Sequence, residues 1–234
     1  MIEGDDYKIV PDERNKYIYN IIFSPYTNNN LLIQSITKTN IIVGATTTND
    51  YTTLRFKAFS IKTFDQYKKE QQLKKKHYQT NLILIKFLVT QLEYLITKTN
   101  HTFIGYNPKN IIVIDDNKFI YLSTEQLFPI DKNDKITITC PFLRNDFFFS
   151  PELEKLKEIP AKIHYKTSYY SLACLIINKI LEQEEQEEEQ EEEQEQDSTQ
   201  IKKLDSLLIK ETKLYWFLKR CLNENPVNRS ILFL

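Results

Sequence analysis

One run of the sequence, residues 105–123, holds most of the residue types that could take part in chemistry. Its first turn carries the amides of Asn107 and Asn110, and a second polar turn carries the carboxylates of Asp115 and Asp116. Amide and carboxylate oxygens are the ligands that hard cations such as Mg²⁺ prefer. Two apolar runs flank the aspartates, and Asp in such a place commonly hydrogen-bonds its own backbone. We therefore interpret both aspartates as turn residues, with a metal site as the alternative.

Other kinds of site are excluded by what is scarce in the chain. Its three glycines, Gly4, Gly44 and Gly105, lie far apart. Glycine-rich phosphate loops need several glycines within one turn, because their backbone adopts positive φ and approaches the phosphate closely. No zinc site is expected, since three Cys and three His show no ligand spacing. We interpret the cysteines as reduced thiols of the core: Cys140, Cys174 and Cys221.

The run GYNPKNIIVIDDNKFIYLS resembles the catalytic loop of protein kinases and the hairpin that follows it. Pro108 and Asn110 match the Pro-x-Asn of that loop. The resemblance puts Gly105 in the place of the catalytic Asp, Asn107 in the place of a Lys, and Ser123 in the place of the metal-binding Asp of the Asp-Phe-Gly motif. Phosphoryl transfer depends on charges at these places, so the resemblance implies that catalysis has been lost.

Further segments resemble kinase motifs in the order that the family has them. They are Ser150-Pro151-Glu152, which is similar to the Ala-Pro-Glu that ends the activation segment, residues 168–173, and residues 218–229. The resemblance implies a buried ion pair between Glu152 and Arg229. It also puts Ser168 in the place of an Asp that braces the catalytic loop. In all, it covers roughly residues 40–234.

The resemblance implies an inactive protein kinase-like domain, a pseudokinase, that acts through contact with a protein partner. No cofactor is expected. Asn110 remains as a weak, vestigial nucleotide ligand, although a structural hydrogen bond across its loop is the simpler role. The alternative is an atypical active Ser/Thr kinase that transfers phosphate from ATP with Mg²⁺. Such an enzyme would need Glu125 or Asp115 as a substitute base or metal ligand.

The elements that must hold these residues begin with a small, reduced, β-rich N-lobe and hinge over residues 1–60. Strands are predicted at 17–24, 41–46 and 52–59, where β-branched and aromatic residues lie between polar turns. Lys57 superficially resembles the Lys of the family's third strand. Hinge-like residues follow it at once, so we place it on the last strand with an exposed side chain. About 39 residues precede the presumed fourth strand, too few for a glycine lid, a Lys strand and a helix of normal size.

A mainly helical C-lobe is predicted over residues 61–234, so we expect an α+β protein of kinase-like architecture. Apolar residues recur at helical spacing over much of this part. Helices are predicted at 63–75, 81–97, 168–181, 201–208 and 212–222, and strands at 111–114 and 119–122. We interpret His101 as a polar residue between a helix and a loop.

The formal net charge of −1 hides an uneven distribution of charge. Residues 182–197 hold ten Glu and one Asp without a Lys or Arg, which leaves 31 basic and 21 acidic residues elsewhere. A disordered insertion is predicted at 182–200, because this segment can bury too little apolar surface to order itself. It is interpreted as a tolerated insertion, with docking of a basic partner as the alternative.

Composition also bears on location and partners. No apolar run approaches the length of a membrane span, so no membrane contact is expected. The acidic N-terminus lacks the apolar stretch of a signal peptide, and we expect an intracellular, cytoplasmic protein. A basic body often attracts phosphate-bearing partners, but no basic and aromatic motif favours nucleic acid here.

Overall fold

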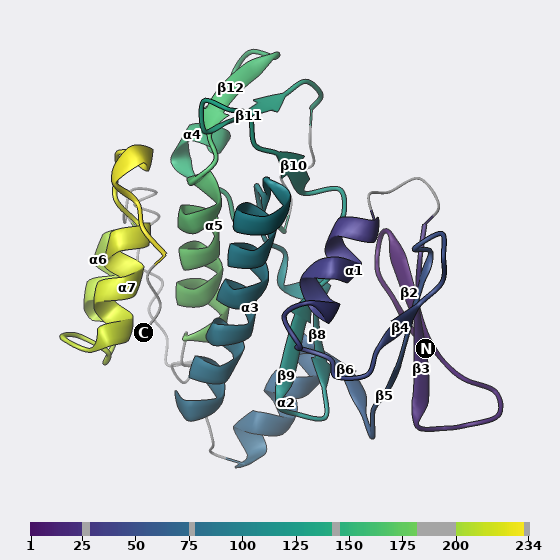
Figure 1. Ribbon diagram of the computed structural model, residues 1–234. Coiled ribbons are helices and arrows are strands. Elements are labelled where there is room, and N and C mark those ends of the chain that lie inside the picture. Colours follow the sequence, from purple (N-terminus) through teal and green to yellow (C-terminus); the bar gives the residue numbers. More distant parts are fainter. Residues whose placement is uncertain (25–28, 75–77, 142–145, 182–199, 232–234) are drawn as a thin grey trace.

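An antiparallel sheet stands beside a larger group of helices in the computed structural model of the chain (Figure 1). The structure describes residues 1–24, 29–74, 78–141, 146–181 and 200–231. The α+β class expected from the sequence is confirmed, because helices and antiparallel strands both make up large parts of the chain. The predicted disordered insertion at 182–200 lies outside the described residues except for Gln200.

The larger sheet is built from β1 (Ile2–Glu3), β2 (Tyr7–Pro11), β3 (Ile18–Phe23), β4 (Thr46–Thr47) and β5 (Thr53–Lys57). Its order is β1-β2-β3-β5-β4, and neighbouring strands are antiparallel. Side chains alternate between its two faces. In β5, Leu54 and Phe56 are buried, whereas Arg55 and Lys57 are exposed. The prediction that Lys57 lies exposed on the last strand is therefore confirmed.

The helix α1 (Asn29–Thr37) lies between the larger sheet and the long helix α3 (Tyr78–Thr99), as Figure 1 shows. Leu32, Ile33 and Ile36 are fully buried, and their spacing puts them on one side of the helix. From the sequence, the segment before residue 40 is expected to be too short for a glycine lid, a Lys strand and a helix of normal size. The helix that it holds has only nine residues and follows short strands, which agrees with a reduced N-terminal part.

Residues 41–46 do not form the predicted strand. Ile41 and Ile42 are both buried although they are consecutive, whereas a strand with one buried face would bury only every second residue. Gly44 then turns the chain with φ of +70°, in the left-handed region that favours glycine. The short strand β4, which begins at Thr46, pairs with β5 directly after this turn.

A second sheet has the order β6-β8-β9 and is built from β6 (Ile61–Thr63), β8 (Ile111–Ile114) and β9 (Lys118–Tyr121). Asp115 and Asp116 form the turn between β8 and β9, as predicted, with φ of 53° and 58°. Asp115 Oδ1 accepts hydrogen bonds from the N–H groups of Phe59 (2.7 Å) and Ser60 (3.1 Å). This turn thus fastens the linker that joins the two sheets.

The remaining elements lie mostly on the helical side. They are α2 (Phe64–Lys74), β7 (His101–Phe103), η1 (Pro108–Asn110), β10 (Leu127–Pro129), β11 (Lys135–Ile138), α4 (Pro151–Glu154), β12 (Ala161–His164), α5 (Thr167–Leu175) with its π-helical continuation η2 (Ile176–Ile180), α6 (Gln200–Ser206), α7 (Lys213–Cys221) and η3 (Pro226–Asn228). The predicted helices and the strands of the β8–β9 hairpin agree with these bounds closely. His101 begins β7, and its Nδ1 lies 2.6 Å from the carbonyl oxygen of Thr99.

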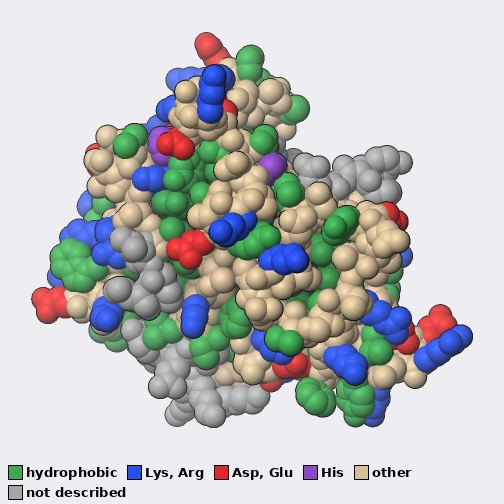
Figure 2. Space-filling model, in the orientation of Figure 1, with side chains coloured by type: hydrophobic (Ala, Val, Ile, Leu, Met, Phe, Trp, Pro, Cys, Tyr) green, Lys and Arg blue, Asp and Glu red, His purple; other side chains and the backbone are tan. Residues whose placement is uncertain are grey.

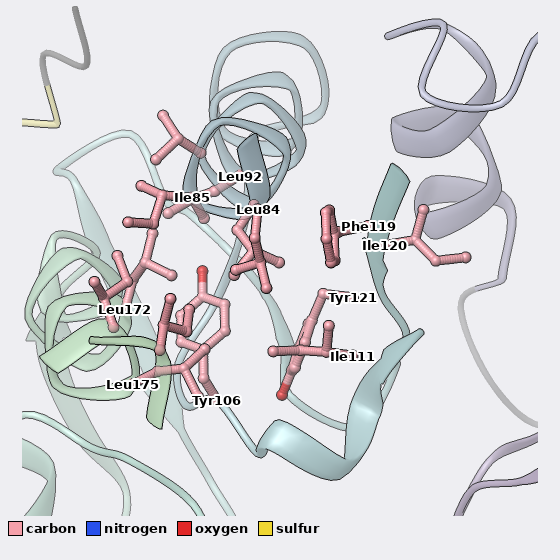
Figure 3. Close-up of a cluster of buried hydrophobic side chains, with 14 of the residues drawn as sticks. Leu84, Ile85, Leu92, Tyr106, Ile111, Phe119, Ile120, Tyr121, Leu172 and Leu175 are labelled. Carbon is pink, nitrogen blue, oxygen red and sulfur yellow. The ribbon is translucent and has the colours of Figure 1, made fainter. Parts of the chain in front are cut away.

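One continuous hydrophobic core joins the larger sheet to the helices. It includes Ile21 and Leu54 from the sheet, Leu88 from α3 and Leu218 from α7. Figure 3 shows its centre, where side chains of α3, α5 and the β8–β9 hairpin meet. Within the described ranges, no helix has the length and apolar character needed to cross a membrane.

Two of the three cysteines are core thiols, as predicted. Cys174 and Cys221 are buried, and burial raises the pKa of both thiols, to about 12 for Cys221. The prediction is wrong for Cys140, which is exposed just after β11. The alternation that buries Ile136 and Ile138 ends with that strand, and the next two residues face solvent.

Glu152 of α4 and Arg229 near the C-terminal end of the described chain lie in contact. The Glu152 carboxylate accepts hydrogen bonds from both terminal nitrogens of the Arg229 guanidinium, and Nη2 lies 3.1 Å from Oε2. The Arg229 side chain is fully buried; its Nε donates to the Asn223 carbonyl (2.8 Å), and the guanidinium lies over the Tyr170 ring. The pair therefore ties α4, α5 and the segment after α7 together.

We predict that Arg229→Ala lowers the free energy of unfolding by about 3–5 kcal/mol, because it leaves a carboxylate without its cation. Urea denaturation measures this loss. Arg55→Ala is the matched control, since Arg55 pairs with Asp12 at the surface and its side chain is 51% exposed. The control should cost less than about 1 kcal/mol. Equal losses in the two variants would contradict the prediction.

Candidate functional site

The loop between β7 and β8 brings together the residues singled out by the sequence. Asn107 caps the single turn η1: its Oδ1 accepts from the Lys109 N–H (3.0 Å), and its carbonyl accepts from the Asn110 N–H (3.0 Å). Pro108 suits the first position of this turn, because its fixed φ is helical and its missing N–H is not needed there. Asn107 and Asn110 are both buried. They act first as parts of the loop's own scaffold.

Tyr121, the last residue of β9, holds this loop from the inside. Its hydroxyl accepts from the Asn107 N–H (3.0 Å) and donates to the Gly105 carbonyl (3.3 Å). The side chains of Asn110 and Ser123 lie beside the phenol and favour its charged form. Burial raises the pKa of Tyr121 well above its ordinary value, and these neighbours offset the rise only in part. The phenol therefore stays protonated at neutral pH and serves as a structural link.

Gly105 lies directly against the ring of Phe149. A Cβ built on this glycine would come within 2.2 Å of Phe149 Cε1, far inside van der Waals contact. The ring thus fills the space that any side chain at residue 105 would need. Phe149 itself is buried in a second apolar cluster with Ile104 and Leu153, so it cannot simply move aside.

The segment after residue 145 is also fixed along the outside of the loop. Tyr106 and Phe148 exchange two backbone hydrogen bonds, of 3.2 and 2.8 Å, as an isolated antiparallel bridge. Lys109 Nζ pairs with the Asp146 carboxylate at 2.7 Å on the surface. Figure 3 shows Tyr106 on the inner side, among side chains of α3 and α5. Both sides of the loop are therefore packed against protein.

Ser123 and Thr124 follow the hairpin and are buried. Thr124 is held by Asp6, from the turn between β1 and β2: the Asp6 carboxylate accepts the Thr124 N–H (2.6 Å) and also hydrogen-bonds the Thr124 hydroxyl. Asp6 is only 7% exposed. Burial and then the neighbouring Asp6 charge raise the pKa of Tyr7. Glu125, in contrast, is exposed.

Gln91 of α3 connects the hairpin to α1. Its Nε2 donates to the Tyr121 carbonyl (2.9 Å) and to Ser35 Oγ of α1 (3.1 Å). Its Oε1 accepts from the Tyr121 N–H (2.9 Å). Gln91 is fully buried, and its amide binds both the N–H and the carbonyl of Tyr121, so it fixes the position of the Tyr121 backbone. The placement of Tyr121, and with it the loop, therefore depends on α3.

The linker between the two sheets offers no spare backbone donor at residues 58–60. The N–H of Ala58 donates to the Tyr17 carbonyl (2.9 Å), and those of Phe59 and Ser60 donate to Asp115. The Asp115 backbone also bonds the linker, since its N–H donates to the Ser60 carbonyl (3.1 Å). This carboxylate, proposed from the sequence as a substitute catalytic group, is thus committed to the linker.

The brace on the loop from α5 comes from a residue other than the one that the sequence indicates. Ser168 Oγ donates to the Tyr165 carbonyl (3.0 Å) and holds only its own turn. Ser171, one turn further along α5, donates to the Ile104 carbonyl (2.9 Å) in the loop. Both hydroxyls are buried. The loop is therefore braced by a neutral hydroxyl rather than by a carboxylate.

The structure gathers Gly105, Asn107, Asn110 and Ser123 around Tyr121, whereas the Glu152–Arg229 pair is a separate contact. Three residues at the site are not indicated by the sequence: Asp6, Tyr121 and Phe149. The sequence offers one signal for Tyr121: it ends an apolar strand, and the hydroxyl of a buried tyrosine usually has a hydrogen-bond partner. In the described ranges, no three His, Cys, Asp or Glu side chains gather in a way that could hold a metal ion.

No model of a known protein family matches this chain, and no curated protein matches it as a relative. The site is therefore interpreted from its own geometry. Its polar groups are amides, hydroxyls and one carboxylate that already accepts two hydrogen bonds. Such a set can hold a loop in place, but it offers no free base next to Gly105.

We predict that Gly105→Asp lowers the free energy of unfolding by at least about 2 kcal/mol and creates no phosphotransfer activity, because the new side chain meets the Phe149 ring. Chemical denaturation and a radiolabelled ATP assay measure the two effects. Adding Phe149→Ala should make the two changes non-additive by about 1 kcal/mol, since the smaller side chain makes room. Strict additivity of the two losses would contradict the proposed contact.

Proposed function

We propose that this chain is an inactive protein kinase-like domain, a pseudokinase, that acts through contact with another protein. The observation that carries the proposal is the Phe149 ring at Gly105, where the resemblance puts the catalytic carboxylate. Kinase catalysis needs a group there that orients the substrate hydroxyl. In this chain the space is filled by an apolar ring from the same protein.

The arrangement of elements supports the kinase-like part of the proposal. A five-stranded antiparallel sheet with a helix after its third strand precedes a helical part. The loop at 104–110, the β8–β9 hairpin, α4 with Glu152, the buried α5 and Arg229 then follow in the order of the kinase motifs. Strand β3 reads IYNIIF and α1 reads NNLLIQSIT. Neither contains the Lys or the Glu that kinases pair at these elements.

The alternative, an atypical active Ser/Thr kinase, is less well supported. Asp115 is committed to the N–H groups of the linker, and Glu125 is exposed. Ser123 and Asn110, which lie beside the Tyr121 phenol, are both neutral. Neutral side chains are weak ligands for Mg²⁺, which prefers carboxylates and phosphates.

Nucleic acid as a partner also finds little support. On the face that Figure 2 shows, Lys and Arg side chains lie at many separate places with acidic side chains between them. A nucleic-acid site usually has a continuous basic stripe. A protein partner fits this mixed surface better, and it would need only the scaffold that Glu152, Arg229 and the helical core provide.

We predict that millimolar ATP with Mg²⁺ raises the melting temperature by less than about 1 °C. A nucleotide bound at ten times its Kd would add about 1.4 kcal/mol by mass action, or roughly 3–6 °C for a chain of this size. Differential scanning fluorimetry measures the shift. A radiolabelled ATP assay with Mg²⁺ and with Mn²⁺ should detect no transfer. Transfer that survives stringent purification and disappears in Asn110→Ala would overturn the proposal.

A further inference from the structure

The turn between β1 and β2 is fastened at three places. The N–H of Gly4 donates to the Tyr7 carbonyl (2.9 Å), which closes the turn itself. The N–H of Ser24 donates to the Asp6 carbonyl (2.9 Å), which ties the turn to the end of β3. The Asp6 side chain then reaches Thr124, 118 residues along the chain, where it accepts two hydrogen bonds.

The turn is also packed too closely to open without cost. A Cβ at Gly4 would come within 2.3 Å of the Tyr7 ring, so only glycine fits against that ring. Tyr7 is buried and belongs to the main core. Asp6, beside it, is therefore held in place by the packing of Tyr7 as well as by Thr124.

The charge on Asp6 is unusual because it is buried without a cation. Asp6 forms no ion pair with a Lys, Arg or His in the part of the chain that the structure describes. A buried carboxylate normally has a cationic partner, since removing the charge from water is costly. Here the backbone N–H and hydroxyl of Thr124 supply the compensation. Such a pair of donors is the kind of group that binds an anion.

We propose that Asp6 is an internal ligand. Its carboxylate fills an anion site formed by the N–H and hydroxyl of Thr124, and so keeps the β1–β2 turn closed over the segment that follows the β8–β9 hairpin. This inference rests on the proposed function. In kinases the turn between the first two strands covers the nucleotide phosphates. In this chain the same turn carries a negative charge to the segment after the hairpin, where it excludes phosphate both by volume and by repulsion.

The first test is chemical rescue of Asp6→Ala by formate. Removing the carboxyl group should lower the melting temperature by roughly 4–8 °C, because two hydrogen bonds to a charged group are lost. Sodium formate, whose carboxylate matches the deleted group, should restore most of this loss relative to sodium chloride at equal ionic strength. Absence of rescue would overturn the proposal. Asp5→Ala is the matched control, since the neighbouring Asp5 is exposed and should respond to neither salt.

The second test uses inorganic tripolyphosphate as the probe of the vacated site. The wild-type chain should show no rise in melting temperature, whereas Asp6→Ala should be stabilised, and Asp6→Ala with Thr124→Val should lose most of that response. Equal responses in wild type and Asp6→Ala would show that Asp6 does not deny the site to phosphate, and would overturn the proposal. Phosphate transfer by the wild-type chain would instead overturn the proposed function, so the two failures are distinguishable.

A third measurement covers the case in which Asp6→Ala does not fold. Asp6→Asn keeps the shape of the side chain and one acceptor oxygen but removes the charge. We expect the Thr124 amide to exchange its hydrogen about tenfold faster in Asp6→Asn than in the wild-type chain, because its bond to a charged acceptor becomes a weaker neutral one. Unchanged exchange at Thr124, with normal exchange elsewhere, would contradict the role of the charge.

Discussion

The buried hydroxyl of Tyr121 is the contact on which the arrangement of the site depends. It joins β9 to the loop at Gly105 and Asn107, and Gln91 fixes the backbone of the same tyrosine from α3. A buried hydroxyl that loses its hydrogen-bond partners destabilises a protein by about 1–3 kcal/mol, so the loop conformation that satisfies Tyr121 is preferred. The position of the loop therefore follows from the packing of the hairpin against α3.

This constraint explains why residue 105 lies in a closed loop without room for a side chain. Once residue 105 has no side chain, the space beside it can accept an apolar ring, and Phe149 occupies it from the second apolar cluster. The bridge between Tyr106 and Phe148 then holds that segment in register. Each contact is favourable by itself, and together they make the loop a packed part of the core. A side chain added at residue 105 would therefore not by itself open the loop, because the Phe149 ring packs directly against the glycine.

The sequence predicts the long, strongly patterned elements and the composition of the loop, but not what surrounds the loop. The hairpin β8–β9 and the helix α3 follow from clear apolar periodicity. The helix α1 and the strands β1 and β2 are short, and their stability comes from packing against partners far along the chain. The contacts of Asp6 with Thr124 and of Phe149 with Gly105 join segments that are distant in sequence. The type of each residue does not indicate which residue it contacts. Local patterns carry no information about such pairs.

The polar groups around Tyr121 differ in how far protein atoms satisfy them. Catalytic groups usually keep donors or acceptors that are free to bind a substrate, and their backbone is often strained. Here the Gln91 amide and the Tyr121 hydroxyl bond protein atoms, whereas the Tyr106 hydroxyl in the same loop is buried without a partner among the described residues. Under the proposed function, the bonded groups stabilise the interior without having to serve a substrate. The interior then holds in shape the surface at which the proposed protein partner would make contact.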